Sequence, residues 1–219
     1  MKGMLSRIKH PFCGISHWLG AGLAVIGTVV LLAMAWGKPM AMVAFSIYGA
    51  SLIGLYVASG LYHSLTCEGR KEVILRKLDH TGIFLLISGT YVPVCLLALS
   101  PRFGWTFLIL QTTLALVGVL GTFFLKKFPE ILNVVLYLLM GWMALPALGY
   151  IGANWPTYAI VLLVTGGIVY TVGAVIYATD RPHLWPGRFS AHDLWHVFVL
   201  GGSACHYALM TTFIAHRPG

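Results

Sequence analysis

Two histidines in an apolar stretch near the end of the chain have the spacing of metal ligands. The stretch AHDLWHVFVLGGSACHY (residues 191–207) has the pattern of an apolar helix, yet it contains His192 and His196. Residues four apart share one face of an α-helix and lie about 6 Å apart along its axis. Two imidazoles use the same spacing to bind zinc in HExxH metalloproteases. We therefore expect both rings to be able to face one metal ion.

The elements that must position these rings are membrane-spanning helices. Only 9% of the 219 residues are charged and 58% are hydrophobic, whereas soluble domains contain about 25% charged residues. A spanning helix needs about 20 mainly apolar residues. We predict an all-α integral membrane bundle that forms a single domain over residues 1–219. The cytoplasmic N-terminal segment is 1–15, and the seven spans are approximately 16–36, 40–65, 79–99, 104–125, 131–151, 158–178 and 192–214.

The distribution of Lys and Arg predicts how the spans are oriented. Eleven of the 14 basic residues precede the first span or lie in every second connection: Lys2, Arg7, Lys9, Arg70, Lys71, Arg76, Lys77, Lys126, Lys127, Arg181 and Arg188. The other three are Lys38, Arg102 and Arg217. Short basic loops stay in the cytoplasm, so we expect a cytoplasmic N-terminus and an extracytoplasmic C-terminus in the inner (plasma) membrane. This alternation explains the net charge of +8 without a nucleic-acid partner.

Other residue types mark the ends and breaks of the spans. Near the ends lie four tryptophans that we expect to be interfacial anchors: Trp36, Trp105, Trp155 and Trp185. Pro93 and Pro146 fall inside spans, where we expect kinks. The four cysteines (Cys13, Cys67, Cys95 and Cys205) lie far apart without a CxxC pair. They predict neither a disulfide framework nor a thiolate zinc site.

With this orientation, polar residues of three spans reach one depth. His63 ends the second span on the cytoplasmic side, Asp79 begins the third, and His192 and His196 begin the seventh. A carboxylate at the membrane edge is costly unless it is paired, and three imidazoles plus water form a tetrahedral zinc site with one open position. We therefore predict Zn²⁺ bound by His63, His192 and His196. Asp79 and Ser59, four residues before His63, are the expected catalytic polar groups, with Asp79 acting through a metal-bound water and Ser59 supporting it.

The remaining polar residues have less specific expectations, since a histidine near a span end is often only an interfacial side chain. His17 either supports the metal site or is interfacial. His80 points about 100° away from Asp79 and is expected to take no part. Asp193 is expected to stabilise the start of the seventh helix. His206 lies roughly 15 Å deeper than His196, where it lines a cavity or bonds another helix.

Five stretches, four of which contain these polar residues, carry a family resemblance. They are SHWLGAGL from Ser16, SGLYH at Ser59–His63, KLDHTGIFLLISGTYVP at Lys77–Pro93, YLLMGW at Tyr137–Trp142 and HDLWHVFVLGGSACH at His192–His206. Together they resemble the hemolysin III branch of the progestin and adipoQ receptor family over nearly the whole chain. Bacterial members usually have a Glu-rich, Asn-containing segment before the first span. This chain has HPFCGIS at that position. We therefore do not assign to it any role that the acidic segment has in those members.

The resemblance implies seven helices with a cytoplasmic N-terminus. It implies zinc held by His63, His192 and His196, with Asp79 contacting the zinc-bound water. It also implies a ceramide-like lipid amide as substrate, because ceramidase activity is ascribed to adipoQ receptors and the alkaline ceramidases are related to them.

Three functions fit these expectations. The first is zinc-dependent hydrolysis of an amide or ester bond in a membrane lipid. The second is a non-enzymatic sensor or regulator of membrane homeostasis with a structural zinc ion. The third is a pore-forming cytolysin, which we disfavour because the sequence has no row of charged residues to line an aqueous pore. The sequence does not determine the oligomeric state.

Reporter fusions test the expected orientation. Alkaline phosphatase fused after Gly219 should be active, because this enzyme matures only outside the cytoplasm. The same reporter fused after Lys127 should be inactive, and β-galactosidase fusions should show the reverse pattern. High phosphatase activity at Lys127 would contradict a cytoplasmic N-terminus.

Overall fold

Seven membrane-spanning helices make up the described part of the protein, residues 8–125, 129–185 and 187–217 of a computed structural model. They are α2 (Pro11–Met34), α3 (Pro39–Ser64), α4 (Arg70–Pro93) continued by η1 (Val94–Ala98), α5 (Pro101–Phe124), α6 (Glu130–Gly141) continued by η2 (Trp142–Ala147) and α7 (Leu148–Asn154), α8 (Thr157–Thr179), and α9 (Ala191–Thr212) followed by η3 (Ile214–His216). The predicted all-α, seven-span class is confirmed. Four residues of the basic pattern (Lys2, Arg7, Lys126 and Lys127) lie outside the described residues.

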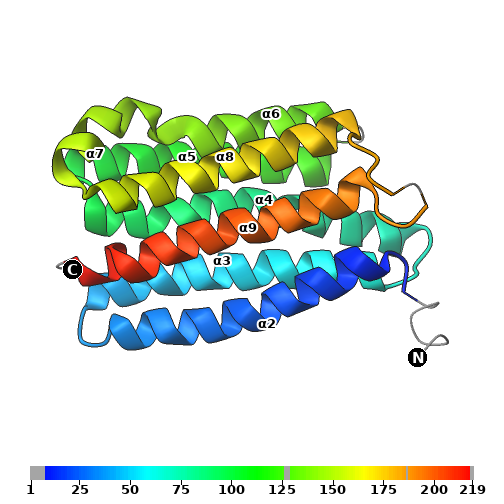
Figure 1. The fold of residues 1–219 in the computed structure, drawn as a ribbon, viewed down its shortest axis with the longest axis horizontal. Helices are drawn as coiled ribbons and strands as arrows, with labels where there is room; N and C mark the ends of the chain where they lie inside the picture. The colour runs from blue at the N-terminus through cyan, green and yellow to red at the C-terminus, as the bar shows by residue number, and fades with distance from the viewer. Residues whose placement is uncertain (1–7, 126–128, 186, 218–219) are drawn as a thin grey trace.

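The helices run up and down, so successive connections alternate between the two ends of the bundle (Figure 1). α2 packs along α3, α3 along α4, and α8 along α9, while α9 also contacts α2. The starts of α2, α4 and α9 and the end of α3 therefore meet at one end of the bundle. Leu19, Ile26 and Ile109 on the outside are 62–64% exposed, as expected of an apolar surface that faces lipid.

Prolines start three of the spans and interrupt two. Pro11, Pro39 and Pro101 are the first residues of α2, α3 and α5, where the missing N–H would have had no helical partner. α4 passes at Pro93 into the π-helical segment η1, and Pro146 lies in the 3₁₀ segment η2. Because proline cannot donate to the preceding turn, regular α-helical bonding ends in both spans where a kink was expected.

The third span begins earlier than its hydropathy indicated. α4 starts at Arg70 rather than near Asp79, so Asp79 lies about 13 Å along the helix at 1.5 Å per residue. The preceding segment RKEVILRK is too charged to be recognised as part of a span. Its basic side chains reach neighbouring helices instead: Lys77 Nζ donates to the carbonyl oxygen of Phe123 at 2.7 Å.

One of the four expected tryptophan anchors is buried inside the protein. Trp36, Trp105 and Trp185 are exposed, whereas Trp155 is 5% exposed. Its Nε1 donates to the carbonyl oxygen of Ala98 at 3.1 Å. The expectation is therefore wrong for Trp155, because its polar atom finds a partner inside the protein.

The close packing of α8 and α9 predicts a stability effect at Gly202. A Cβ atom there would lie 2.7 Å from the ring of Tyr170. Gly202→Ala should lower the melting temperature in detergent, because overpacking costs about 1–3 kcal/mol. In the control variant Gly54→Ala the new methyl group meets no atom within 4 Å, so its melting temperature should not fall. Equal melting temperatures for both variants would contradict the α8–α9 packing.

Candidate metal centre

The ring nitrogens of three histidines meet between α3 and α9. His192 Nε2 lies 3.5 Å from His63 Nε2 and 3.2 Å from His196 Nε2. His63 and His196 are each 2% exposed, and His192 is partly buried. We call these three residues the histidine cluster. The structure thus brings together the histidines that sequence reasoning placed at one depth.

The spacing in the histidine cluster fits a small tetrahedral metal ion. With metal–nitrogen distances of about 2.0–2.1 Å, two ligand atoms of such a site lie roughly 3.3 Å apart. The two Nε2 separations lie on either side of this value. Lone pairs of neutral imidazoles repel one another, so nitrogens that converge in a buried space are better satisfied by a shared cation. Imidazole binds zinc, copper, iron and nickel, and the residues present fit such an ion.

The start of α9 sets the register of two of the three rings. Ser190 Oγ accepts a hydrogen bond from the Asp193 backbone N–H at 3.1 Å, and Asp193 Oδ2 accepts one from the Ser190 N–H at 2.8 Å. This reciprocal pair is a capping box, which fixes where a helix begins. Asp193 therefore has its expected structural role, and it directs His192 and His196 to one face.

Cys13 also lies at the histidine cluster, contrary to the expectation from cysteine spacing. Its Sγ and the three histidine nitrogens all lie within 4.8 Å of one another. Cys13 is 1% exposed, and its Sγ donates a hydrogen bond to Asp193 Oδ1 at 3.1 Å. Sequence reasoning considered only cysteines that are close in sequence, whereas α2 packs against α3 and α9. One feature of the sequence could have pointed to Cys13. It precedes His17 by four residues, so both side chains lie on one face of the same helix.

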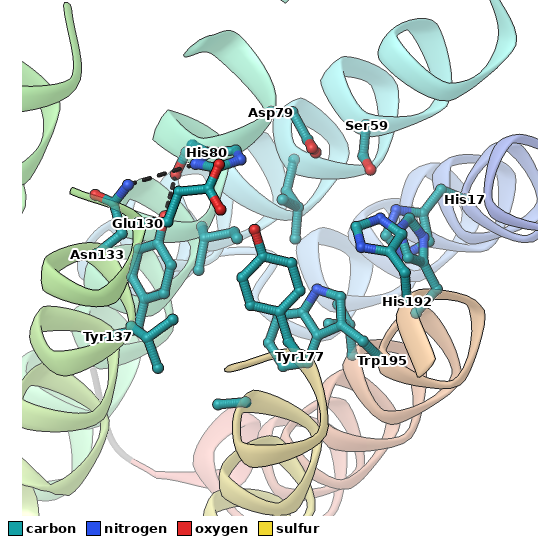
Figure 2. A pocket seen from close by; sticks show the side chains of 16 residues that line it. His17, Ser59, Asp79, His80, Glu130, Asn133, Tyr137, Tyr177, His192 and Trp195 are labelled. Carbon is teal, nitrogen blue, oxygen red and sulfur yellow. Dashed lines mark hydrogen bonds between the residues drawn. The ribbon is translucent and has the colours of Figure 1, made fainter. Parts of the chain in front are cut away.

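Asp79 faces the histidine cluster from α4. It is 9% exposed, and its Oδ2 lies 3.7 Å from His63 Nε2. This distance exceeds a hydrogen bond, so the carboxylate has room to contact a further group beside the cluster. Ser59 of α3 is 1% exposed. Figure 2 shows its hydroxyl and the Asp79 carboxylate pointing into the same space as the ring of His192.

Of the histidines that sequence reasoning left open, His17 and His80 lie at this site and His206 lies deeper in the bundle. The ring centroid of His17 lies 3.9 Å from that of His196, and neither ring nitrogen of His17 has a hydrogen-bond partner among the described residues. His17 is 3% exposed, so its ring packs against that of His196 inside the bundle rather than at the interface. His80, from which no part was expected, lines the cavity beside Asn133. His206 lines a deeper cavity, with its Nε2 3.3 Å from the carbonyl oxygen of Leu163.

The histidine cluster lies between a polar opening and an apolar chamber. A cavity of about 40 Å³ touches Ser59, Asp79 and the rings of His192 and His196. Toward the helix ends lies the mouth, a polar opening whose lining includes His10, Arg76, His80, Glu130, Arg188 and Asp193. On the inner side lies the apolar chamber, about 90 Å³, whose lining includes Ile83, Leu86, Tyr137, Trp142, Trp195 and Val199. Tyr137, Trp195 and Val199 line both the small cavity and the chamber, which are therefore neighbours.

The segment before α2 is fastened beside the cluster. The His10 N–H donates to the carbonyl oxygen of His63 at 2.9 Å, and Lys9 Nζ donates to Glu72 Oε1 at 2.7 Å. Burial alone would lower the pKa of Lys9, but the hydrogen bond to Glu72 raises it above its usual value. Partial burial, with a contribution from His63, lowers the pKa of His10. These contacts hold the segment before α2 against α3 and α4.

The fold and the site together define a multi-pass, heptahelical membrane protein with a candidate metal centre inside the bundle. The chain belongs to the haemolysin-III related family, which matches residues 6–207. It is 36% identical to Hemolysin-3 of Bacillus cereus over 98% of this chain and 96% of that protein. It is 37% identical to the Hemolysin-3 homolog of Bacillus subtilis (strain 168) over 93% of each.

A plant protein is a more distant relative. Heptahelical transmembrane protein 5 of Arabidopsis thaliana is 31% identical over 78% of this chain and 50% of its own length. The family resemblance seen in the sequence motifs is confirmed by these matches. The bacterial relatives indicate the plasma membrane as its location.

Metal analysis tests the histidine cluster. Alanine at His63, His192 or His196 should reduce a stoichiometric metal content to a small fraction, because two nitrogens replace three. Loss of a residue that only hydrogen-bonds to a metal ligand typically lowers metal affinity 10–100-fold. Loss of a ligand itself should cost at least as much. His206→Ala, on the same helix but roughly 15 Å from His196, should retain the metal. Equal metal content in all four folded variants would exclude the cluster as the binding site.

Proposed function

We propose that this protein is a zinc-dependent hydrolase of an amide or ester bond in a membrane lipid, such as a ceramide-like amide. One observation carries the proposal: the histidine cluster, a buried carboxylate and an apolar chamber adjoin one another inside the bundle. Zinc bound by such a cluster polarises a carbonyl group and acidifies water. Open three-histidine sites are typical of catalytic zinc.

Asp79 is the general base of the proposed reaction. Its carboxylate borders the small cavity and lies close to His63, so it can accept the proton of an attacking water molecule. It then returns this proton to the departing amine or alcohol. Ser59, beside it on α3, orients the carboxylate. Proton transfer of this kind typically contributes 10²–10⁴-fold to the rate.

The apolar chamber and the mouth give the substrate an orientation. An acyl chain in the chamber would contact Leu86, Trp142 and Val199 and gain about 0.8 kcal/mol per buried methylene group. The polar part of the lipid would remain toward Glu130 and Arg188 at the mouth. The bond to be cleaved then lies between them, beside the histidine cluster.

A second function is supported by Cys13. Its sulfur would be a fourth donor atom beside three imidazole nitrogens. Four protein ligands form the closed set that is typical of structural zinc sites. A permanently closed site would make the protein a membrane sensor or regulator that holds zinc without turnover.

Replacement of Asp79 separates the two functions. Asp79→Asn should lower fatty-acid release from a short-chain ceramide by about 10²–10⁴-fold, because the amide cannot act as a base. Zinc content and melting temperature should stay near those of the wild type. Turnover is measured with purified protein in detergent. Glu68→Gln, at an exposed acid of the α3–α4 connection, is the control and should keep full turnover.

Two results would contradict the proposed hydrolase or the proposed role of Asp79. A zinc-loaded wild type that releases no fatty acid from amide or ester lipids, under conditions in which a related ceramidase does, would reject the hydrolase. Unchanged turnover of Asp79→Asn would reject Asp79 as the base.

A further inference from the structure

The sulfur of Cys13 is placed to complete the coordination of the metal. We propose that Cys13 is a fourth, displaceable ligand, so that its thiolate and a water molecule compete for one coordination position. This inference rests on the proposed metal site and adds a means of regulating it. The spacing of the cysteines did not predict this role for Cys13, and a site of three histidines plus water would be complete without it.

Four donor atoms lie together, which is the number that a tetrahedral zinc site needs. Cys13 Sγ and the three cluster nitrogens lie within 4.8 Å of one another, and zinc–sulfur bonds are about 2.3 Å long. Cys13, His63 and His196 are each no more than 2% exposed. Nδ1 of His63 and Nδ1 of His196 have no hydrogen-bond partner among the described residues, so no hydrogen bond at Nδ1 holds these rings in another orientation. Thiolate is a soft ligand that suits zinc.

Two partners compete for the same sulfur. As a thiol, Cys13 donates its hydrogen to Asp193 Oδ1 at 3.1 Å. A thiolate has no hydrogen to donate, so binding to the metal breaks this contact. The capping box with Ser190 holds the Asp193 carboxylate in place. The protein therefore offers the sulfur two exclusive states, one bonded to Asp193 and one bonded to the metal.

The exchange between these states involves no oxidation. When the sulfur binds, the S–H bond breaks, the metal–sulfur bond forms, and one water leaves the metal. The proton passes to solvent through the mouth, which Cys13, Asp193 and His192 all line. When the sulfur leaves, these changes are reversed, and water again occupies the position beside Asp79.

The backbone around Cys13 keeps the sulfur within reach of the cluster. A Cβ atom at Gly14 would lie 2.7 Å from Ser64 Oγ, so glycine allows α2 to approach the end of α3 closely. The hydrogen bond from His10 N–H to the His63 carbonyl oxygen fastens the residue three positions earlier. Cys13 is thus held between two contacts with α3, and exchange needs only a side-chain movement.

Zinc X-ray absorption of the full-length protein in detergent tests the proposal. With one equivalent of zinc under reducing conditions, the wild type should show one sulfur at about 2.3 Å and nitrogen ligands at about 2.0–2.1 Å. Cys13→Ser should lose the sulfur signal and keep the nitrogen signal. Cys67→Ser, in the α3–α4 connection and outside the cluster, is the matched control and should keep both. Acetohydroxamate, a zinc-chelating probe, should remove the sulfur signal from the wild type.

Each outcome decides between the claims. Bound zinc with nitrogen but no sulfur in the wild type would overturn the role of Cys13 and leave the proposed function standing. Failure to bind any metal would overturn both. A sulfur signal that persists in Cys13→Ser would also overturn the inference. A signal that acetohydroxamate cannot displace would make Cys13 a permanent ligand and reject the competition. If Cys13→Ser does not fold, the spectra of the wild type and Cys67→Ser, with and without acetohydroxamate, still decide.

Discussion

The convergence of imidazole nitrogens inside an apolar bundle is the constraint on which the rest of the site depends. Polar atoms buried in a membrane protein cost free energy unless they find partners. His63, His192 and His196 turn their Nε2 atoms toward one another at 3.2–3.5 Å, which satisfies them poorly without a cation. The surrounding contacts maintain this arrangement: the capping box of α9, the approach of α2 at Gly14, and the ring contact between His17 and His196.

The same arrangement separates polar from apolar space along the bundle. Charged residues line the mouth at the helix ends, the histidine cluster lies beneath it, and the chamber beyond is almost wholly apolar. A lipid has the same division within one molecule, which is why the proposed substrate class follows from the order of these cavities. Asp79 lies at the boundary, where one carboxylate can serve a reaction at the junction of headgroup and chain.

The sequence was most informative where one physical effect dominates. Hydropathy located seven spans, and the depth of His63, Asp79 and His192 followed from counting along them. It failed where effects compete. The charged start of α4 is helical and Lys77 bonds to α5, while Trp155 is buried with its N–H bonded to Ala98. Cys13 could not be found from cysteine spacing, because its neighbours in space come from other helices. Tertiary packing, rather than local pattern, decides these positions.

The candidate metal donors come from helices that are far apart in the sequence. Cys13 and His63 belong to the first two spans, and His192 and His196 belong to the last. During translation, the early donors enter the bilayer while α9 is still inside the ribosome or not yet made. The proposed metal site can therefore form only after α9 has inserted and docked. Metal uptake by the proposed site would then report that α9 has inserted, and a chain that stops before α9 would leave His63 without His192 and His196.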